Sequence, residues 1–530
     1  MPWSSMTNAA TFWLVTGLMS TTFAAAQHTP HDVATALANA GFVLEPVRTI
    51  ERTLLDTFDG RLHTAGLRLE SRVGHATELV LSGVDTATAV LLVAAAPSVT
   101  DQLPAGPFRR RVAEAAEDRA LLAVVRVRTR CTSASRRDAD GKIVAAATIW
   151  EQLSIDGHDG LTMVPCTVEV ETLRGFEKHA RKTFATLAGL GLAQLDHDTL
   201  AEAARVAQIH IGGYPGPSDI VLDPAMLAID GCCEVLTGLA NTIAANWQGT
   251  IDETDIEFLH DLRIAVRRTR TVLGEAKKVL PSHMLSKART EFAQLGSVTG
   301  PSRDLDVYIV EWPTYTDGLA PDIVSALEPV RALLRQRQIA AHRELNDALR
   351  APTTTAFVTQ WRLWLAGPID DGDEPAPAAH DPLIDVVAKR IMSAHTRLVE
   401  AGRLIRSDTP AEHVHDLRKD AKKLRYLIEC FGSVLSEKPR KTFVRRLKVL
   451  QDNLGVHQDA EVHVATLREI ADELHERGER SATMLAVGQL TERIDQRRRA
   501  ARAEFAERFA AYDIDDTRDD LERALGRGPR

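Results

Sequence analysis

The chain is poor in aromatic residues and in cysteine. Phe, Trp and Tyr make up 5% of its 530 residues, so a folded core must be mostly aliphatic, and few rings are present to stack on nucleic-acid bases. Its five cysteines form no Cys-x-x-Cys pair, and their odd count and scattered spacing fit neither a disulfide framework nor a zinc site. We therefore expect reduced, mostly buried thiols, no metal and no other cofactor.

Long hydrophobic runs are also scarce. The most apolar stretch, residues 10–26, is shorter than a convincing membrane span and ends in small residues, as a secretory signal does. No Lys or Arg precedes it, so the basic start of such a signal is missing. We interpret residues 1–30 as a disordered or signal-like tail, which leaves export open.

An excess of positive charge is missing globally but is present locally. The formal net charge is −9, which argues against a general nucleic-acid binder. Residues 260–289, however, contain eight Lys or Arg against two acids, net +6. Residues 415–448 contain eleven against four, net +7. Positive charge is therefore concentrated in two segments, as the attraction of a polyanion requires.

Two loop-like stretches predict the domain organisation. Residues 211–224 are dense in Gly and Pro, and residues 367–382 are acidic and Pro-rich, so both are typical of linkers. Strand patterns dominate before the first stretch and helical periodicity after it. The expected domains are an α+β domain over 31–210 and an all-α domain over 225–515, with halves 225–366 and 382–515.

Alternating residues predict strands in the first domain. The run Leu121–Arg130 ends in alternation that places three arginines on one face: Arg126, Arg128 and Arg130. A turn at Asp138–Gly141 predicts a hairpin with the strand that follows. Residues 167–171 alternate again, which places Glu169 and Glu171 on one face.

The strongest pattern is a gapless internal repeat at an offset of 155 residues. The segment His260-Asp261-Leu262-Arg263 recurs as His415-Asp416-Leu417-Arg418. Residues 295–307 recur as residues 450–462 through shared Leu, Gly, Asp and Val positions. Such a repeat indicates a duplication and predicts two similar helical bundles.

Each copy is expected to place its histidine about two turns into a helix with a basic face. Thr254-x-x-Glu257 and Thr409-x-x-Glu412 have the spacing of capping boxes. In each copy, the basic face of this helix lacks acidic partners four residues away. Its positive side chains therefore repel one another unless an anion compensates their charge. The alternative is a solvated basic face that keeps the protein in solution. The two faces consist of His260, Arg263, Arg267 and Arg270, and of His415, Arg418, Lys422 and Arg425.

These segments resemble the CHAD domain family. HDLRIAVRRTR and HDLRKDAKKLR are similar to its histidine-bearing helices, and LGSVTGPSRDLDV and LQDNLGVHQDAEV are similar to its second motif. The resemblance covers about residues 225–510. It implies two pseudo-symmetric helical bundles around a basic groove or pore that binds inorganic polyphosphate. The binding residues would be His260, Arg263, Arg267, Arg268, Arg270, Arg303, His415, Arg418, Lys419, Lys422, Lys423, Arg425, Arg445 and Lys448.

The second copy departs from the family's second motif. Gln458 stands where the first copy has Arg303, and Glu461 stands where it has Asp306. The second motif of this copy is therefore expected to contribute less to binding.

Residues 55–72 resemble a segment of CYTH domains, a triphosphate tunnel fold that often precedes CHAD domains. That resemblance implies an antiparallel tunnel lined with Arg, Lys and Glu, in which carboxylates hold a divalent metal that hydrolyses triphosphates. The Glu-x-Glu-x-Lys motif is absent from residues 1–60, and Glu70 stands where the family has Arg. Residues 145–150 are apolar or neutral where the family has an acidic pair. We therefore expect a degenerate, tunnel-like barrel without catalytic residues.

The sequence thus predicts a bacterial, cytoplasmic polyphosphate-binding protein that associates with polyphosphate granules and not with a membrane. One alternative is a metal-dependent triphosphatase acting through the first domain. The other is a nucleic-acid-binding protein, which the low aromatic content disfavours. The triphosphatase would use Arg126, Arg128, Glu169 and Glu171. The pattern does not determine the oligomeric state.

Overall fold

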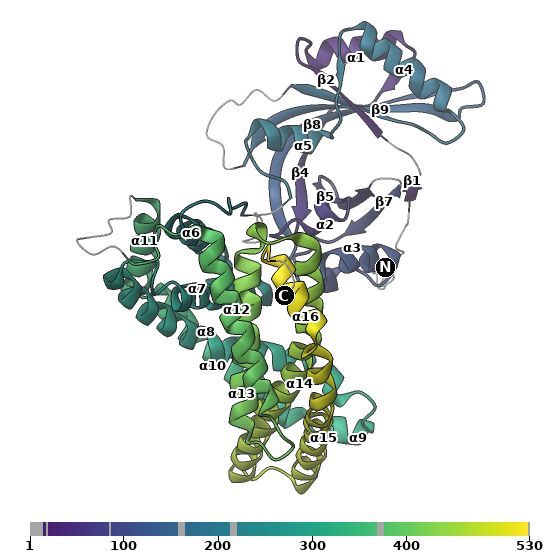
Figure 1. Ribbon diagram of the computed structural model, residues 1–530. Coiled ribbons are helices and arrows are strands. Elements are labelled where there is room, and N and C mark those ends of the chain that lie inside the picture. The colour runs from purple at the N-terminus through teal and green to yellow at the C-terminus, as the bar shows by residue number, and fades with distance from the viewer. Residues whose placement is uncertain are drawn as a thin grey trace. The chain divides into compact units, whose positions relative to one another are not determined.

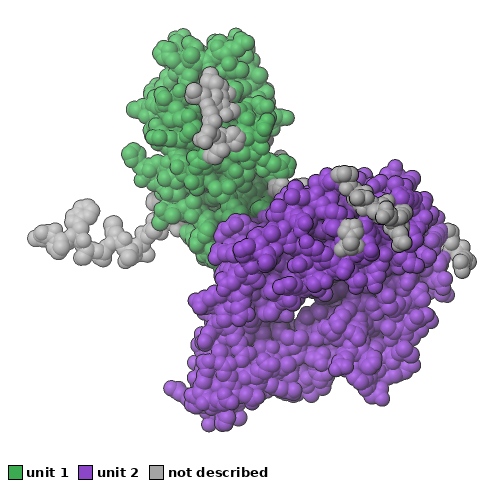
Figure 2. Space-filling view, turned by 90° about the vertical axis from the view of Figure 1, so that its left-hand side faces the viewer, with its two compact units in different colours: residues 1–214 green, residues 215–530 purple. Residues whose placement is uncertain are grey.

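The computed structural model describes residues 14–16, 20–83, 86–156, 165–212, 220–367 and 376–527. It divides into two compact units, residues 1–214 and 215–530 (Figures 1 and 2). The division falls within the first predicted linker. Residues 213–219 and 368–375 of the two predicted linkers lie outside the described residues.

An antiparallel sheet forms the frame of unit 1. Its strands are β1 (Leu14–Thr16), β2 (Ser20–Ala25), β3 (Val43–Leu44), β4 (Arg48–Asp56), β5 (Leu67–Val73), β6 (Thr77–Gly83), β7 (Thr86–Val93), β8 (Leu122–Arg137), β9 (Ile143–Ile155), β10 (Cys166–Glu171) and β11 (Ala193–Gln194). The order along the sheet is β1-β7-β6-β5-β4-β8-β9-β10-β2-β11, with β3 paired to β8. Among the described residues β1 and β11 are not paired with each other, so the curved sheet is open (Figure 1). The predicted antiparallel sheet is confirmed, but it does not close into a barrel.

Short helices pack on this sheet. They are α1 (Pro30–Asn39), α2 (Arg61–Thr64), α3 (Pro107–Ala116), α4 (Glu177–Gly189) and α5 (Thr199–Val206). Helices α1 and α4 contact β9, and their apolar residues share a cluster with Phe23 and Ile149. Helix α5 contacts β8 and packs on the face that carries Leu54 and Val127. We call this second face the inner face.

Strand β2 lies inside the sheet. For residues 20–25 the prediction of a disordered or signal-like tail over residues 1–30 is therefore wrong. The strand pairs with β10 over six residues and with β11 on its other side. The side chains of Phe23 and Ala25 are each 2% exposed and belong to the core. The N-terminal part of the predicted tail, residues 1–13, lies outside the described residues. Residues 20–25 therefore contribute to folding of unit 1.

The predicted hairpin is confirmed, but the predicted grouping of its arginines with Glu169 and Glu171 is wrong. Gly141 adopts a φ of 79° in the turn, and the Asp138 carboxylate accepts from two backbone N–H groups there. Arg126, Arg128 and Arg130 are exposed. Cross-strand pairing places Thr129, Gln152, Thr148 and Glu169 on the inner face, opposite to these arginines. The three arginines therefore cannot form one site with Glu169 and Glu171.

The described part of unit 2 is built from helices joined by short connections. Its helices are α6 (Ala228–Ile251), α7 (Ile256–Glu275), α8 (Ser282–Thr316), α9 (Pro321–Ala326), α10 (Glu328–Arg350), α11 (Pro352–Ala366), α12 (Leu383–Arg403), α13 (Ala411–Cys430), α14 (Glu437–Glu476), α15 (Ser481–Tyr512) and α16 (Asp515–Ala524). Helices α12, α13 and α14 each begin 155 residues after α6, α7 and α8. The predicted pair of repeated helical bundles is therefore confirmed. The unit also includes α16, which extends beyond the predicted end at residue 515.

Backbone hydrogen bonds join the starts of the two copies in a symmetric pattern, which we call the backbone clasp. Each bond has a counterpart 155 residues away, so the copies are related by an approximate two-fold axis. The donors and acceptors are Ala228 N to Asp381 O (2.9 Å) and Leu383 N to Met226 O (2.8 Å), then Ile229 N to Ala379 O (3.0 Å) and Ile384 N to Pro224 O (3.1 Å).

The predicted capping boxes are wrong in both copies. The N-cap of α7 is Asp255, whose carboxylate accepts from the N–H groups of Glu257 and Phe258. The N-cap of α13 is Pro410, which has no side-chain acceptor, and Thr409 instead accepts from the N–H of Arg406. The two helices nevertheless begin and end at matching positions, because their buried faces fix the register.

Candidate anion-binding site

Helices α7 and α13 contact each other and contribute four half-buried cationic side chains at matching positions of the repeat. We call these side chains the basic cluster. Two come from each copy: Arg263 and Arg267 from α7, and Arg418 and Lys422 from α13.

The members of the basic cluster repel one another. Burial lowers the pKa of Lys422 to about 7, and the positive charges of Arg267 and Arg418 add to the effect. Burial also lowers the pKa of Arg263; Asp304 opposes this effect and Arg267 adds to it. The lowered pKa of Lys422 therefore reflects mainly its burial, to which the neighbouring arginines add and which Asp459 opposes.

Two equivalent carboxylates lie beside the cluster. Arg263 Nη2 is 3.7 Å from Asp304 Oδ1, and Arg418 Nη2 is 2.8 Å from Asp459 Oδ1. A Cβ atom at Gly300 would lie 3.2 Å from Arg263 Nη1. The glycine of the second motif therefore leaves room for the arginine to lie against helix α8.

Several predicted binding residues instead make ion pairs within the protein. Arg268 binds Glu429 at 2.6 Å, Lys423 binds Glu275, and Arg425 binds Glu429 at 2.5 Å. Arg425 and Glu429 are four residues apart, so the prediction that the basic face lacks such partners is wrong here. Arg303 Nη1 donates to the carbonyl of Ile256 at 3.1 Å, and Arg303 Nη2 is 3.5 Å from Glu257. These cations secure helix contacts and have less freedom to bind a ligand.

The two predicted histidines are both half-buried on the basic helices. His415 Nδ1 is 2.7 Å from Oε1 of Gln458. Gln458 therefore does more than remove a charge, because it holds the orientation of the His415 ring. The first copy has Arg303 at that position, so the two halves of the site differ around their histidines.

The remaining predicted residues lie at the surface. Arg270, Lys419, Arg445 and Lys448 are exposed, and Lys419 pairs with Asp416 at 3.0 Å. Arg270 lines a surface pocket with Arg289, Ser286 and Thr290. The structure does not join Arg445 and Lys448 to the basic cluster.

The sequence prediction missed an aromatic group close to Asp459. His463 stacks on Tyr308 at a ring distance of 4.1 Å, and its Nδ1 is 2.8 Å from the hydroxyl of Tyr315. Burial lowers the pKa of His463. A pocket beside this group is lined by Asp459, Tyr315, Glu311 and Arg497 among other residues. The sequence gives no sign of this group, because the aromatic partners of His463 come from helix α8.

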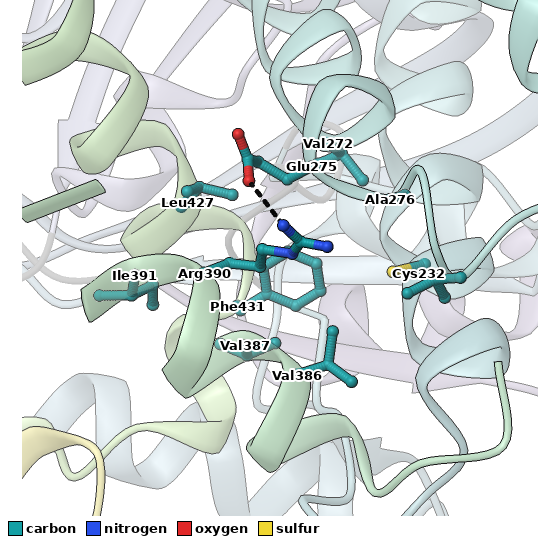
Figure 3. A pocket seen from close by; sticks show the side chains of 11 residues that line it. Cys232, Val272, Glu275, Ala276, Val386, Val387, Arg390, Ile391, Leu427 and Phe431 are labelled. Carbon is teal, nitrogen blue, oxygen red and sulfur yellow. Dashed lines mark ion pairs between the residues drawn. The ribbon is translucent and has the colours of Figure 1, made fainter. Parts of the chain in front are cut away.

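The contact between the two copies also contains an apolar pocket (Figure 3). Cys232, Val272, Val387 and Leu427 are among its lining residues, and Arg390 lies 3.8 Å from Glu275 beside them. Because the only charges in its lining neutralise each other, this pocket does not suit an anion.

The inner face of unit 1 contains a buried carboxylate surrounded by arginines. Glu70 binds Arg52 at 2.6 Å, Arg72 at 2.7 Å and Arg68 at 3.4 Å. Burial alone would raise the pKa of Glu70, but Arg52 and Arg72 hold it well below its usual range. Arg52 also lies 3.8 Å over the ring of Trp150, whose Nε1 donates to Glu169. The carboxylate thus occupies the position at which these arginines could otherwise hold an anion.

Neither a metal site nor a membrane span emerges from the described part of the chain. No three His, Cys, Asp or Glu side chains within it converge closely enough to hold a metal ion. None of the helices described is long and apolar enough to span a bilayer.

The helical unit is similar to a known protein family. Residues 234–468 match the family model of the CHAD domain. Two uncharacterised proteins of Mycobacterium tuberculosis are 26% identical over 227 residues, and the matched part covers 41% of this chain and 41% of each relative. Less than half the length of these curated relatives is therefore matched.

Three solved structures match parts of this chain at low sequence identity. The CHAD domain from the plant Ricinus communis is 23% identical, with a TM-score of 0.47, over 56% of this chain and 96% of its own. PptA from Streptomyces chartreusis is 19% identical, with a TM-score of 0.42, over 54% and 99%. A Hippeastrum protein with a dominant triphosphatase activity is 13% identical, with a TM-score of 0.25, over 35% and 93%.

The duplicated helices and their paired basic faces define unit 2 as a helical domain with an internal two-fold repeat. Residues 234–468 of this unit are a CHAD domain.

Proposed function

We propose that unit 2 binds inorganic polyphosphate through the basic cluster. The observation that carries the proposal is the convergence of four cations from equivalent positions, with the pKa of Lys422 lowered to about 7 by burial and by its neighbours. A polyphosphate chain offers about one negative charge per unit, so it matches a site with several closely spaced cations. Association with polyphosphate granules would follow from such binding.

Titration of the full chain with long-chain polyphosphate at several salt concentrations tests this function. The logarithm of the affinity should fall linearly with the logarithm of the salt concentration, because bound counterions are released. RNA added as a competitor at fixed salt should displace polyphosphate poorly. Absence of binding at low salt, or equal competition by RNA, would contradict the proposal.

Binding should also depend on pH through Lys422. A bound polyanion stabilises the protonated amine, so binding takes up a proton and is stronger below the pKa of about 7 of the free protein. Affinity should therefore fall about tenfold between about pH 6 and pH 8 through this group alone. Lys422→Met should bind about tenfold less tightly than the wild type near pH 6 and about equally near pH 8.

Comparison of the two proteins at each pH isolates Lys422, because every other titratable group of the site is present in both. A constant ratio of affinities across this pH range would show that Lys422 does not change its protonation on binding.

Unit 1 offers less support for the alternative of a triphosphatase. Its inner-face arginines already bind Glu70, and Arg126 and Arg128 lie on the opposite face. Phosphate release from tripolyphosphate in the presence of magnesium or manganese would test this alternative directly.

A further inference from the structure

Two carboxylates occupy equivalent positions beside the basic cluster. Asp304 and Asp459 pair with Arg263 and Arg418, and their side chains keep 64% and 53% of their surface exposed. They are therefore reachable from solvent, and a ligand that approaches the arginines meets the carboxylates as well. Figure 2 shows that the surface of unit 2 is hollowed by an opening (Figure 2).

The two carboxylates also act on each other. The pKa of Asp304 is raised because nearby protein groups displace part of its water, and the charge of Asp459 adds to the rise. Arg263 and Arg267 on α7 oppose it. Other titratable groups also face the two carboxylates. Lys422 interacts with Asp459, His463 acts on Asp304, and Glu311 and Arg497 line the pocket beside Asp459. Two like charges thus lie close together where the repeat brings its copies face to face.

We propose that Asp304 and Asp459 are built-in counter-anions that a polyphosphate chain must displace, and that they make the site selective for long chains over short phosphates. This inference rests on the proposed function. A short phosphate that reaches Arg263 or Arg418 exchanges one anionic partner for another and gains little. A long chain engages the whole cluster at once and releases many counterions, so its net gain is larger.

The opposite role for the same residues predicts the opposite result. If the carboxylates served to hold Arg263 and Arg418 in position, their removal would weaken the binding of every phosphate. Arg263 is also placed by its approach to Gly300 and to the carbonyl of Gly296 at 3.5 Å, so its position does not depend on Asp304 alone.

Calorimetric titration of Asp304→Asn, Asp459→Asn and the double variant with tripolyphosphate and with long-chain polyphosphate tests the inference. The double variant should bind tripolyphosphate about tenfold more tightly than the wild type, since each released arginine offers a charge-assisted hydrogen bond. Its gain for the long chain should be smaller. Asp472→Asn, which removes an exposed carboxylate farther along α14, should leave both affinities nearly unchanged.

Unchanged or weaker binding of tripolyphosphate by the double variant would overturn the inference, as would an equal gain for both ligands or an equal gain in Asp472→Asn. The proposed function is judged separately, by whether the wild type binds the long chain at all. If the wild type does not bind it, both proposals fall. Because both carboxylates are more than half exposed, their replacement should leave the thermal unfolding temperature close to that of the wild type.

Discussion

Alanine at all four positions of the basic cluster should lower the affinity for long-chain polyphosphate by at least about a thousandfold at low salt. Each position contributes a charge-assisted hydrogen bond to phosphate, and four such contacts together exceed the free energy that this factor represents. The protein should remain folded, because the buried sides of the helices, with Leu262 and Leu417 in the core, are unchanged. Alanine is also favourable within helices. The measurement is a titration with circular dichroism as the check of folding.

A matched variant separates this site from the effect of net charge. It removes four exposed arginines elsewhere on unit 2 and thus changes the charge by the same amount. Its affinity should fall by far less than that of the cluster variant, and its salt dependence should stay close to that of the wild type. Equal losses in the two variants would mean that no localised site exists. The four control positions are Arg343, Arg350, Arg362 and Arg480.

Glu70→Ala should destabilise unit 1 by about 3–5 kcal/mol, the usual cost of removing one partner from a buried ion pair. The side chain of Glu70 is 4% exposed, and Arg52 beside it is 1% exposed. Without the carboxylate, Arg52, Arg68 and Arg72 repel one another in a site from which water is largely excluded. Chemical denaturation gives the free energy of unfolding, and amide hydrogen exchange of β4 and β5 localises the loss to this sheet.

Glu51→Ala is the control for this prediction. Glu51 also lies on β4 and pairs with Arg126 at 3.5 Å, but both side chains are about half exposed. Its removal should cost less than about 1 kcal/mol, as is usual for ion pairs at the surface. A similar cost for the two variants would show that water compensates the inner arginines.

Much of unit 2 could be predicted, because its helices have a regular hydrophobic period and its two halves repeat the same motifs. The 155-residue offset is visible in the sequence and reappears in the starts of three helix pairs. The caps could not be placed by spacing alone, since Asp255 is an equally good cap one residue after Thr254. In unit 1, a β-bulge at Arg128/Thr129 and the pairing of neighbouring strands decide which side chains share a face.

The sequence indicates the cations of the candidate site but not the carboxylates that lie beside them. Arg263 and Arg418 follow from the helical period and the repeat. Their partners Asp304 and Asp459 are more than 40 positions away, and only the packing of α7 on α8 and of α13 on α14 brings them together. The ion pairs of Arg268 and Lys423 join the two copies, so helical spacing within one copy could not reveal them.

The backbone clasp makes this domain a covalently fused dimer. Each copy has backbone donors and acceptors whose partners lie in the other copy. A single copy produced alone would leave these groups unpaired unless it dimerised, and the fraction of dimer would depend on the protein concentration. Because both copies belong to one chain, their pairing does not depend on the protein concentration. Fusion also allows the two copies to differ. A substitution in a symmetric dimer changes both subunits, whereas here one copy has Arg303 and the other has Gln458 at the equivalent position.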